Sequence, residues 1–165
     1  MESRLKILGH PVHPMLIVFP LGLLSTAVIF DVLYVLTENA DLATFSYWAL
    51  VAGLVGGVLA AIFGVIDWMG LPKGTRAKRV GAAHGVGNLV VTALFALSLA
   101  ARLDDPVFLP SILPLVFGLL GAALAVVTAW LGGELVYRLR VGVDDDANLD
   151  ASNSLQRDGA VEVQR

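Results

Sequence analysis

Four long apolar stretches separated by short polar segments dominate the chain. They cover residues 15–36, 45–68, 81–101 and 113–137. Each can cross the ~30 Å hydrocarbon core of a bilayer, which takes roughly 20 helical residues. Only helices or closed barrels satisfy the backbone in lipid, and these stretches lack the alternation of a barrel strand. The pattern therefore predicts four transmembrane helices.

Short links between the stretches predict antiparallel neighbours, and hence an all-α integral membrane protein built as a four-helix antiparallel bundle. This domain is expected to cover residues 1–143. Six of the 14 acidic residues follow Val143, and residues 144–165 are almost free of apolar pattern. They are therefore expected to form an acidic, disordered tail.

Three prolines shape the start of the expected first helix. Pro14 can open it, because the missing N–H of proline costs nothing in the first turn of a helix. His10-Pro11 and His13-Pro14 should hold the segment before it extended. Pro20 should kink or loosen the following turn.

Composition agrees with a membrane protein and narrows the chemistry. The chain is 57% hydrophobic and 15% charged, with a mean hydropathy of +0.79, well outside the range of soluble domains. It contains no cysteine, which excludes disulfides, thiol catalysis and cysteine-ligated iron–sulfur clusters. Histidine, aspartate and glutamate remain as metal-binding side chains.

The basic residues predict the orientation. One membrane face is flanked by Arg4, Lys6, Lys73, Arg76, Lys78, Arg79, Arg138 and Arg140, whereas Arg102 alone flanks the other. By the positive-inside rule, both termini are expected in the cytoplasm and the protein in the inner (cytoplasmic) membrane. Anionic lipid headgroups are the expected partners of these basic residues, and no nucleic acid is expected.

Ionisable residues in or beside the spans are few, and most belong to the cytoplasmic face. In an antiparallel bundle, the starts of the odd helices meet the ends of the even ones. Five residues are therefore expected to converge there: His10, His13, Asp67, His84 and Glu134. Asp31 stands apart near the outer end of the first helix, with no obvious basic partner in the spans, and is expected to accept a buried hydrogen bond. Such intramembrane groups are functional-site hypotheses by default.

Two interpretations of the cluster stay open. As a binding site, its three histidines and two carboxylates suit iron, manganese, zinc or copper, whereas haem would need His84 with either His13 or His10. As a structural feature, His84 would hydrogen-bond to Asp67 and Glu134 and hold the helices together. On either interpretation, a nearby donor or cation must offset an electrostatic cost, because a carboxylate in a last helical turn meets the negative end of the helix dipole.

Two further residues are candidates for supporting roles. Asn88 lies four residues after His84, hence on the same helix face, where it could orient that ring or bind a substrate. Trp68 adjoins Asp67. The two halves of the chain are also weakly similar, since a histidine opens each odd span and an acid closes each even one.

Several segments resemble a bacterial membrane family catalogued as domain of unknown function 2231. They are residues 9–14 (GHPVHP), residues 64–68 (GVIDW), His84 and residues 130–138 (WLGGELVYR). The likeness covers about residues 8–143. Some members of that family are joined to Rieske-type iron–sulfur domains, which implies a place in membrane electron transfer. Because this chain has no such domain, the resemblance implies a separate redox protein as its partner.

The leading hypothesis is a redox-associated membrane protein that binds a metal or haem at the cytoplasmic interface. His10, His13 and His84 would bind it, with Asp67 and Glu134 as ligands or supporting groups. The alternative is a non-catalytic membrane subunit or scaffold whose polar cluster only fixes helix packing. A small transporter is disfavoured, because no midplane polar site is evident. Two questions stay open: whether the protein is an enzyme, and whether the chain forms a homo-oligomer.

Overall fold

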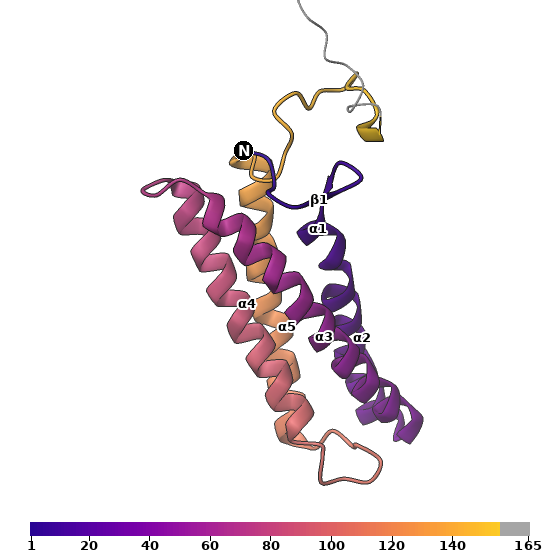
Figure 1. The fold of residues 1–165 in the computed structure, drawn as a ribbon. Coiled ribbons are helices and arrows are strands. Elements are labelled where there is room, and N and C mark those ends of the chain that lie inside the picture. The colour runs from indigo at the N-terminus through magenta and orange to yellow at the C-terminus, as the bar shows by residue number, and fades with distance from the viewer. Residues whose placement is uncertain (156–165) are drawn as a thin grey trace, which may run out of the picture.

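The apolar stretches form four long helical spans in the computed structural model, which describes residues 1–155. The spans run Val12–Thr37, Ala40–Gly70, Arg76–Ala100 and Ile112–Arg138. Consecutive spans run in opposite directions (Figure 1). The predicted fold class is therefore confirmed. The expected disorder of the acidic tail stays a prediction, and residues 156–165 lie outside the described part of the chain.

The first span consists of two helices, α1 (Val12–Leu16) and α2 (Val18–Thr37), which are interrupted at Ile17. Pro20 explains the interruption. It has no N–H to donate to the carbonyl of Leu16, four residues earlier, so the helical ladder loses one bond there.

The first helix starts earlier than the sequence predicts. It begins at Val12 rather than Pro14, and Pro14 occupies its first turn. His13 is therefore helical and lies inside the first span rather than in an extended lead-in.

The remaining spans are α3 (Ala40–Gly70), α4 (Arg76–Ala100) and α5 (Ile112–Gly133), which continues into the π-helical turn η1 (Glu134–Arg138). Two of these helices start at side-chain caps. Asn39 accepts from the backbone N–H of Asp41, and Thr75 accepts from that of Lys78. Such caps satisfy N–H groups that have no partner within the helix.

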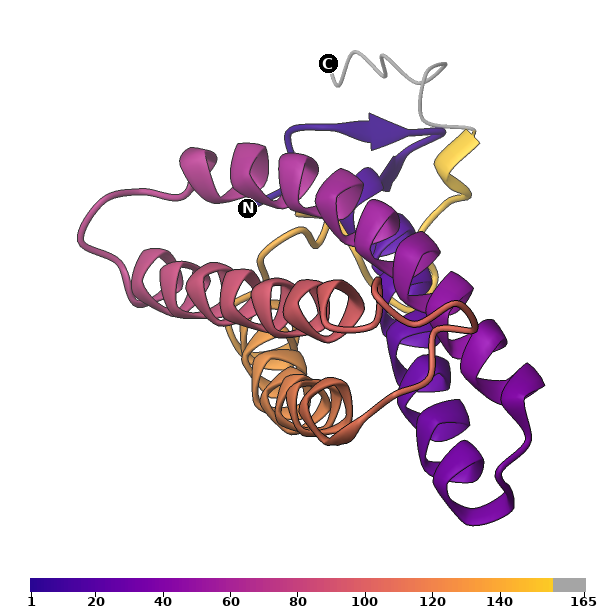
Figure 2. The same ribbon diagram turned by 90° about the horizontal axis from the view of Figure 1, so that it is seen from below.

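The spans pack as two helical hairpins, α2 with α3 and α4 with α5, and α3 also crosses onto α4 (Figure 2). The buried core comprises Leu24, Ala27, Leu50, Val91 and Phe95, contributed by all the long helices except α5. Outward-facing positions remain apolar, with Leu89 69% exposed and Val126 72% exposed. This pattern suits a bundle whose solvent is lipid.

The bundle has two distinct ends. The terminal face carries residues 1–5, the link at residues 71–75 and η1. It also carries a small hairpin of β1 (Lys6–Ile7) and β2 (His10–Pro11), whose turn residues Leu8 and Gly9 both have positive φ. The loop face carries the links at residues 38–39 and 101–111.

Candidate functional site

The first imidazole of the site belongs to His13, whose ring packs against α3. Its Nδ1 lies 2.8 Å from the carbonyl oxygen of Ala60. Gly64 makes this contact feasible, because a Cβ there would lie 2.9 Å from Cε1 of the ring. A helical side chain covers the turn before its own Cα. A glycine four residues after Ala60 therefore leaves that carbonyl open to the ring.

His84 repeats the arrangement in the second hairpin. Its Nδ1 lies 2.8 Å from the carbonyl oxygen of Thr128 in α5. Gly132 follows Thr128 by four residues, and a Cβ on it would lie 3.2 Å from Cε1 of the ring. Both halves of the chain thus share one local arrangement of imidazole, carbonyl and glycine, which extends the weak similarity of their sequences.

Asn88 distinguishes the two halves. Its Nδ2 lies 3.1 Å from Nε2 of His84, and its Oδ1 accepts a 3.0 Å hydrogen bond from the Thr128 hydroxyl. Asn88 therefore contacts the ring, as the spacing of four residues predicts. Both ring nitrogens of His84 have partners, whereas the described residues supply no hydrogen bond to Nε2 of His13.

These bonds define the protonation state of each neutral ring. A carbonyl oxygen can only accept, so Nδ1 carries the proton in both His13 and His84, and Nε2 carries the lone pair. Histidines that bind metals usually donate their other ring N–H in this way, which fixes the ring's orientation.

The carboxylate of Asp67 is held by the N-terminal segment rather than by a histidine. The Ser3 hydroxyl lies 2.7 and 2.8 Å from its two oxygens and donates its single hydrogen between them, and the backbone N–H of Arg4 donates at 2.8 Å. These donors offset the unfavourable place of an acid near a helix C-terminus.

Glu134 also lies near the end of a helical span, and its charge is compensated by a 2.6 Å ion pair with Arg76 at the start of α4. The structural interpretation, in which His84 bonds to Asp67 and Glu134, is therefore wrong about the partners of the ring. The ring bonds instead to Thr128 and Asn88.

His10 lies outside the bundle, exposed on β2, with Nε2 3.3 Å from the hydroxyl of Ser154. The expected single cluster is not formed. Among residues 1–155, no group of three or more His, Asp or Glu side chains could hold a metal ion. The antiparallel topology places the five predicted residues toward one end of the bundle, but each side chain has its own partners. These residues are His10, His13, Asp67, His84 and Glu134.

Trp68 supports the junction of α3 and α4. Its Nε1 donates to the carbonyl of Lys78 at 3.1 Å. The ammonium of Lys78 in turn lies 3.8 Å from the centroid of the Trp68 ring and donates to the Trp68 carbonyl at 2.7 Å. This mutual contact fixes the turn that leads into the helix of His84.

A second polar site lies toward the loop face, where Asp31 pairs with Arg102. The two carboxylate oxygens accept from Nη1 at 2.8 Å and from Nη2 at 2.5 Å. The side chains are 2% and 0% exposed, respectively. The prediction that Asp31 accepts a buried hydrogen bond is therefore confirmed, and its basic partner, Arg102, lies just beyond the end of α4 rather than within a span.

Arg102 uses all five of its N–H donors. Besides Asp31, it donates to the hydroxyls of Ser46 and Ser98 and to the Ser98 carbonyl. The Ser98 hydroxyl donates to the carbonyl of Pro114 in α5. The guanidinium thus links all four spans.

The sequence carries a signal for this pair that its interpretation missed. Asp31 lies near the end of one span and Arg102 directly follows another, so antiparallel packing places them at similar depth. Arg102 was assigned to the exposed loop, whereas its long side chain reaches back into the bundle. The loop face therefore loses its one flanking basic residue to the interior.

A family model described as a predicted membrane protein, DUF2231, matches the chain. It covers residues 9–145, which include both histidine arrangements and the Asp31–Arg102 pair. Comparisons with curated proteins and with solved structures give no match.

Proposed function

We propose that this chain, which belongs to the DUF2231 family of predicted membrane proteins, is a redox-associated protein that binds haem or a transition metal through His13 and His84. One observation carries the proposal. In each half of the chain, an imidazole donates its Nδ1–H to a helix carbonyl that a glycine leaves open. That bond leaves Nε2 as the metal-binding atom.

The donor set favours haem over a bare metal ion. Structural and catalytic metal ions usually take three or four protein ligands, more than the described residues bring together. Haem iron needs one or two axial ligands, and two neutral imidazoles from different helices suit it. Bound haem would supply one-electron transfer, with a separate redox protein as partner.

The other predicted ligands are left out of this set for specific reasons. His10 is exposed, Asp67 already accepts from the Ser3 hydroxyl and the Arg4 N–H and Glu134 is paired with Arg76. Ligation at His84 also requires Asn88 to release Nε2, which costs about the 0.5–1.5 kcal/mol of an ordinary hydrogen bond.

We place the protein in the cytoplasmic membrane with both termini in the cytoplasm. The basic residues flank the terminal face, and positive charge marks the cytoplasmic side. Burial of Arg102 sharpens this asymmetry, because its charge is paired within the bundle instead of flanking the opposite side.

A scaffold is the second candidate, and the contacts of His84 favour it. Asn88 and Thr128 satisfy both of its ring nitrogens within one hairpin. On this alternative, the imidazoles only hold each hairpin together, as Arg102 holds the two hairpins to each other.

The test is an absorption spectrum with elemental analysis of protein expressed with iron, copper, zinc and haem precursors available. We expect a sharp haem band that shifts on reduction, lost in His13→Ala and in His84→Ala. His10→Ala is the matched control and should retain the band. Wild-type protein that carries neither haem nor a near-stoichiometric metal would refute ligand binding and favour the scaffold.

A further inference from the structure

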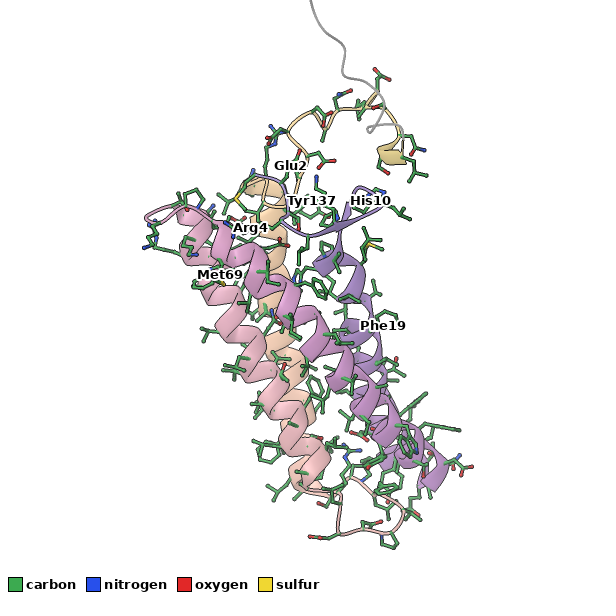
Figure 3. All side chains as sticks on the ribbon, in the orientation of Figure 1. Glu2, Arg4, His10, Phe19, Met69 and Tyr137 are labelled. Atoms are coloured by element: carbon green, nitrogen blue, oxygen red, sulfur yellow. The ribbon has the colours of Figure 1, made fainter. Side chains whose placement is uncertain are left out.

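Residues 1–5 form a strap across the terminal face of the bundle. At one end, the carbonyl of Met1 accepts a 2.9 Å bond from the N–H of Gly142, just after η1. At the other end, the carbonyl of Leu5 accepts a 3.1 Å bond from the N–H of Val12, where α1 begins. Figure 3 shows Glu2 and Arg4 at the terminal face of the bundle. The strap therefore joins the end of the fourth span to the start of the first.

The middle of the strap is anchored on Asp67. The Ser3 hydroxyl donates its one hydrogen between the two carboxylate oxygens, and Oδ1 also accepts from the backbone N–H of Arg4. Ser3 is only 8% exposed. The Arg4 side chain lies over Gly70, where an added Cβ would come within 2.5 Å of its Nε. A single carboxylate thus holds the strap against α3.

The strap and His13 occupy one face of α3. Ala60, Gly64 and Asp67 follow each other at intervals of four and three residues, which places them in one stripe. His13 contacts the stripe at Ala60 and Gly64, and the strap contacts it one turn closer to the terminal face, at Asp67. Access to His13 along this stripe from the terminal face therefore passes the strap.

We infer that the strap is a gate over His13, closed by the bonds from Ser3 and Arg4 to Asp67. The inference rests on the proposed function for its purpose, because a gate matters only if Nε2 of His13 takes a ligand. It gives Asp67 a positioning role through the strap in place of the ligand role predicted from sequence. The two imidazoles then differ in access, because His84 lies in the other hairpin and its Nε2 is hydrogen-bonded by Asn88.

The experiment measures access to each ring without any cofactor. Cofactor-free protein in lipid nanodiscs is treated with diethylpyrocarbonate, and modification of His10, His13 and His84 is followed by peptide mass spectrometry. In the wild type, exposed His10 should react fastest and His13 slowly. Asp67→Ala and Ser3→Ala should each raise the His13 rate about tenfold, as expected for the loss of charge-assisted bonds.

Glu134→Ala is the matched control, because Glu134 also closes an even span but is paired with Arg76 rather than the strap. It should leave the His13 rate unchanged. The gate is refuted if wild-type His13 reacts as fast as His10, or if neither strap variant changes its rate. If Asp67→Ala also accelerates His84, the bundle has opened as a whole and Ser3→Ala decides. Loss of the haem signal alone refutes the proposed function and leaves this result standing.

Discussion

Replacing Arg102 by methionine should strongly destabilise the bundle, and replacing Asp31 by leucine in the same chain should restore most of the loss. In the single variant, the Asp31 carboxylate keeps its buried place but loses both donors that the structure gives it. Breaking a buried ion pair by removing one partner costs about 3–5 kcal/mol. At 1.4 kcal/mol per tenfold, that lowers the folding equilibrium constant by about 10²–10⁴-fold.

The double variant should be nearly neutral, because no charge is left behind. The two serines that contact Arg102 retain backbone acceptors, with Ser46 donating to Ala27 at 3.0 Å and Ser98 to Pro114 at 2.8 Å. Replacing a buried ion pair by apolar side chains of similar size is often neutral or stabilising.

The assay is unfolding in mixed micelles by increasing mole fraction of sodium dodecyl sulfate, followed by circular dichroism. A double-mutant cycle gives the coupling energy between the two sites, which should exceed about 1.5 kcal/mol. Arg138→Met removes an exposed basic residue at the other end and should change stability by less than about 0.5 kcal/mol. Additive losses in the double variant would contradict the assignment of one coupled, buried pair.

The remaining predictions use the same preparation. Gly64→Ala should be more destabilising than Gly132→Ala, at about 1–3 kcal/mol for overpacking, because its Cβ would lie 2.9 Å rather than 3.2 Å from an imidazole carbon. Gly22→Ala, where a Cβ meets no atom within 4 Å, should be harmless. The reverse order would show that these glycines do not make room for the imidazoles. The hydrogen bond from Lys6 lowers the pKa of Glu2 from its ordinary 4.5, and hydrogen bonds to Asp144 and then Glu2 raise the pKa of Lys6 from 10.5. Hydrogen-exchange protection of residues 1–12, corrected for the intrinsic pH dependence of exchange, should therefore stay constant over about pH 5–10. Protection should fall when the pH drops below 4.5 toward the lowered pKa of Glu2, and also when the pH rises above 10.5 toward the raised pKa of Lys6. A change in protection between pH 6 and 8 would count against these contacts. Reporter fusions after residues 36 and 140 should locate the first outside and the second in the cytoplasm, and a translocated C-terminus would reverse the proposed orientation.

The fold followed from the sequence because the bilayer imposes simple constraints. Span length, short links and the lack of strand periodicity leave few arrangements for four apolar stretches. Contacts within one helix were also predictable where residue spacing alone determines them, as for Asn88 on the same helix face as His84. The start of the first helix was misplaced because Pro14 is compatible with several positions in a first turn, so its presence cannot specify the first residue.

The candidate site was only partly readable, because antiparallel topology gives the depth of a residue and not the direction of its side chain. The histidines and acids lie toward one end of the bundle, yet each side chain has hydrogen-bond partners outside this group. His13 reached a carbonyl opened by Gly64, and Asp67 took the Ser3 hydroxyl. The latter contact spans 64 residues of sequence, and no local pattern predicts it.

The Asp31–Arg102 pair also has a consequence for biosynthesis. The carboxylate is made 71 residues before its guanidinium partner, so the first hairpin must enter the bilayer while that acid still lacks its counter-ion. An isolated hairpin with an unpaired acid in hydrocarbon is unfavourable, and nascent chains arrested before the second hairpin should be short-lived. Completion of the third span supplies the guanidinium, and the first hairpin is then held to the second by this pair.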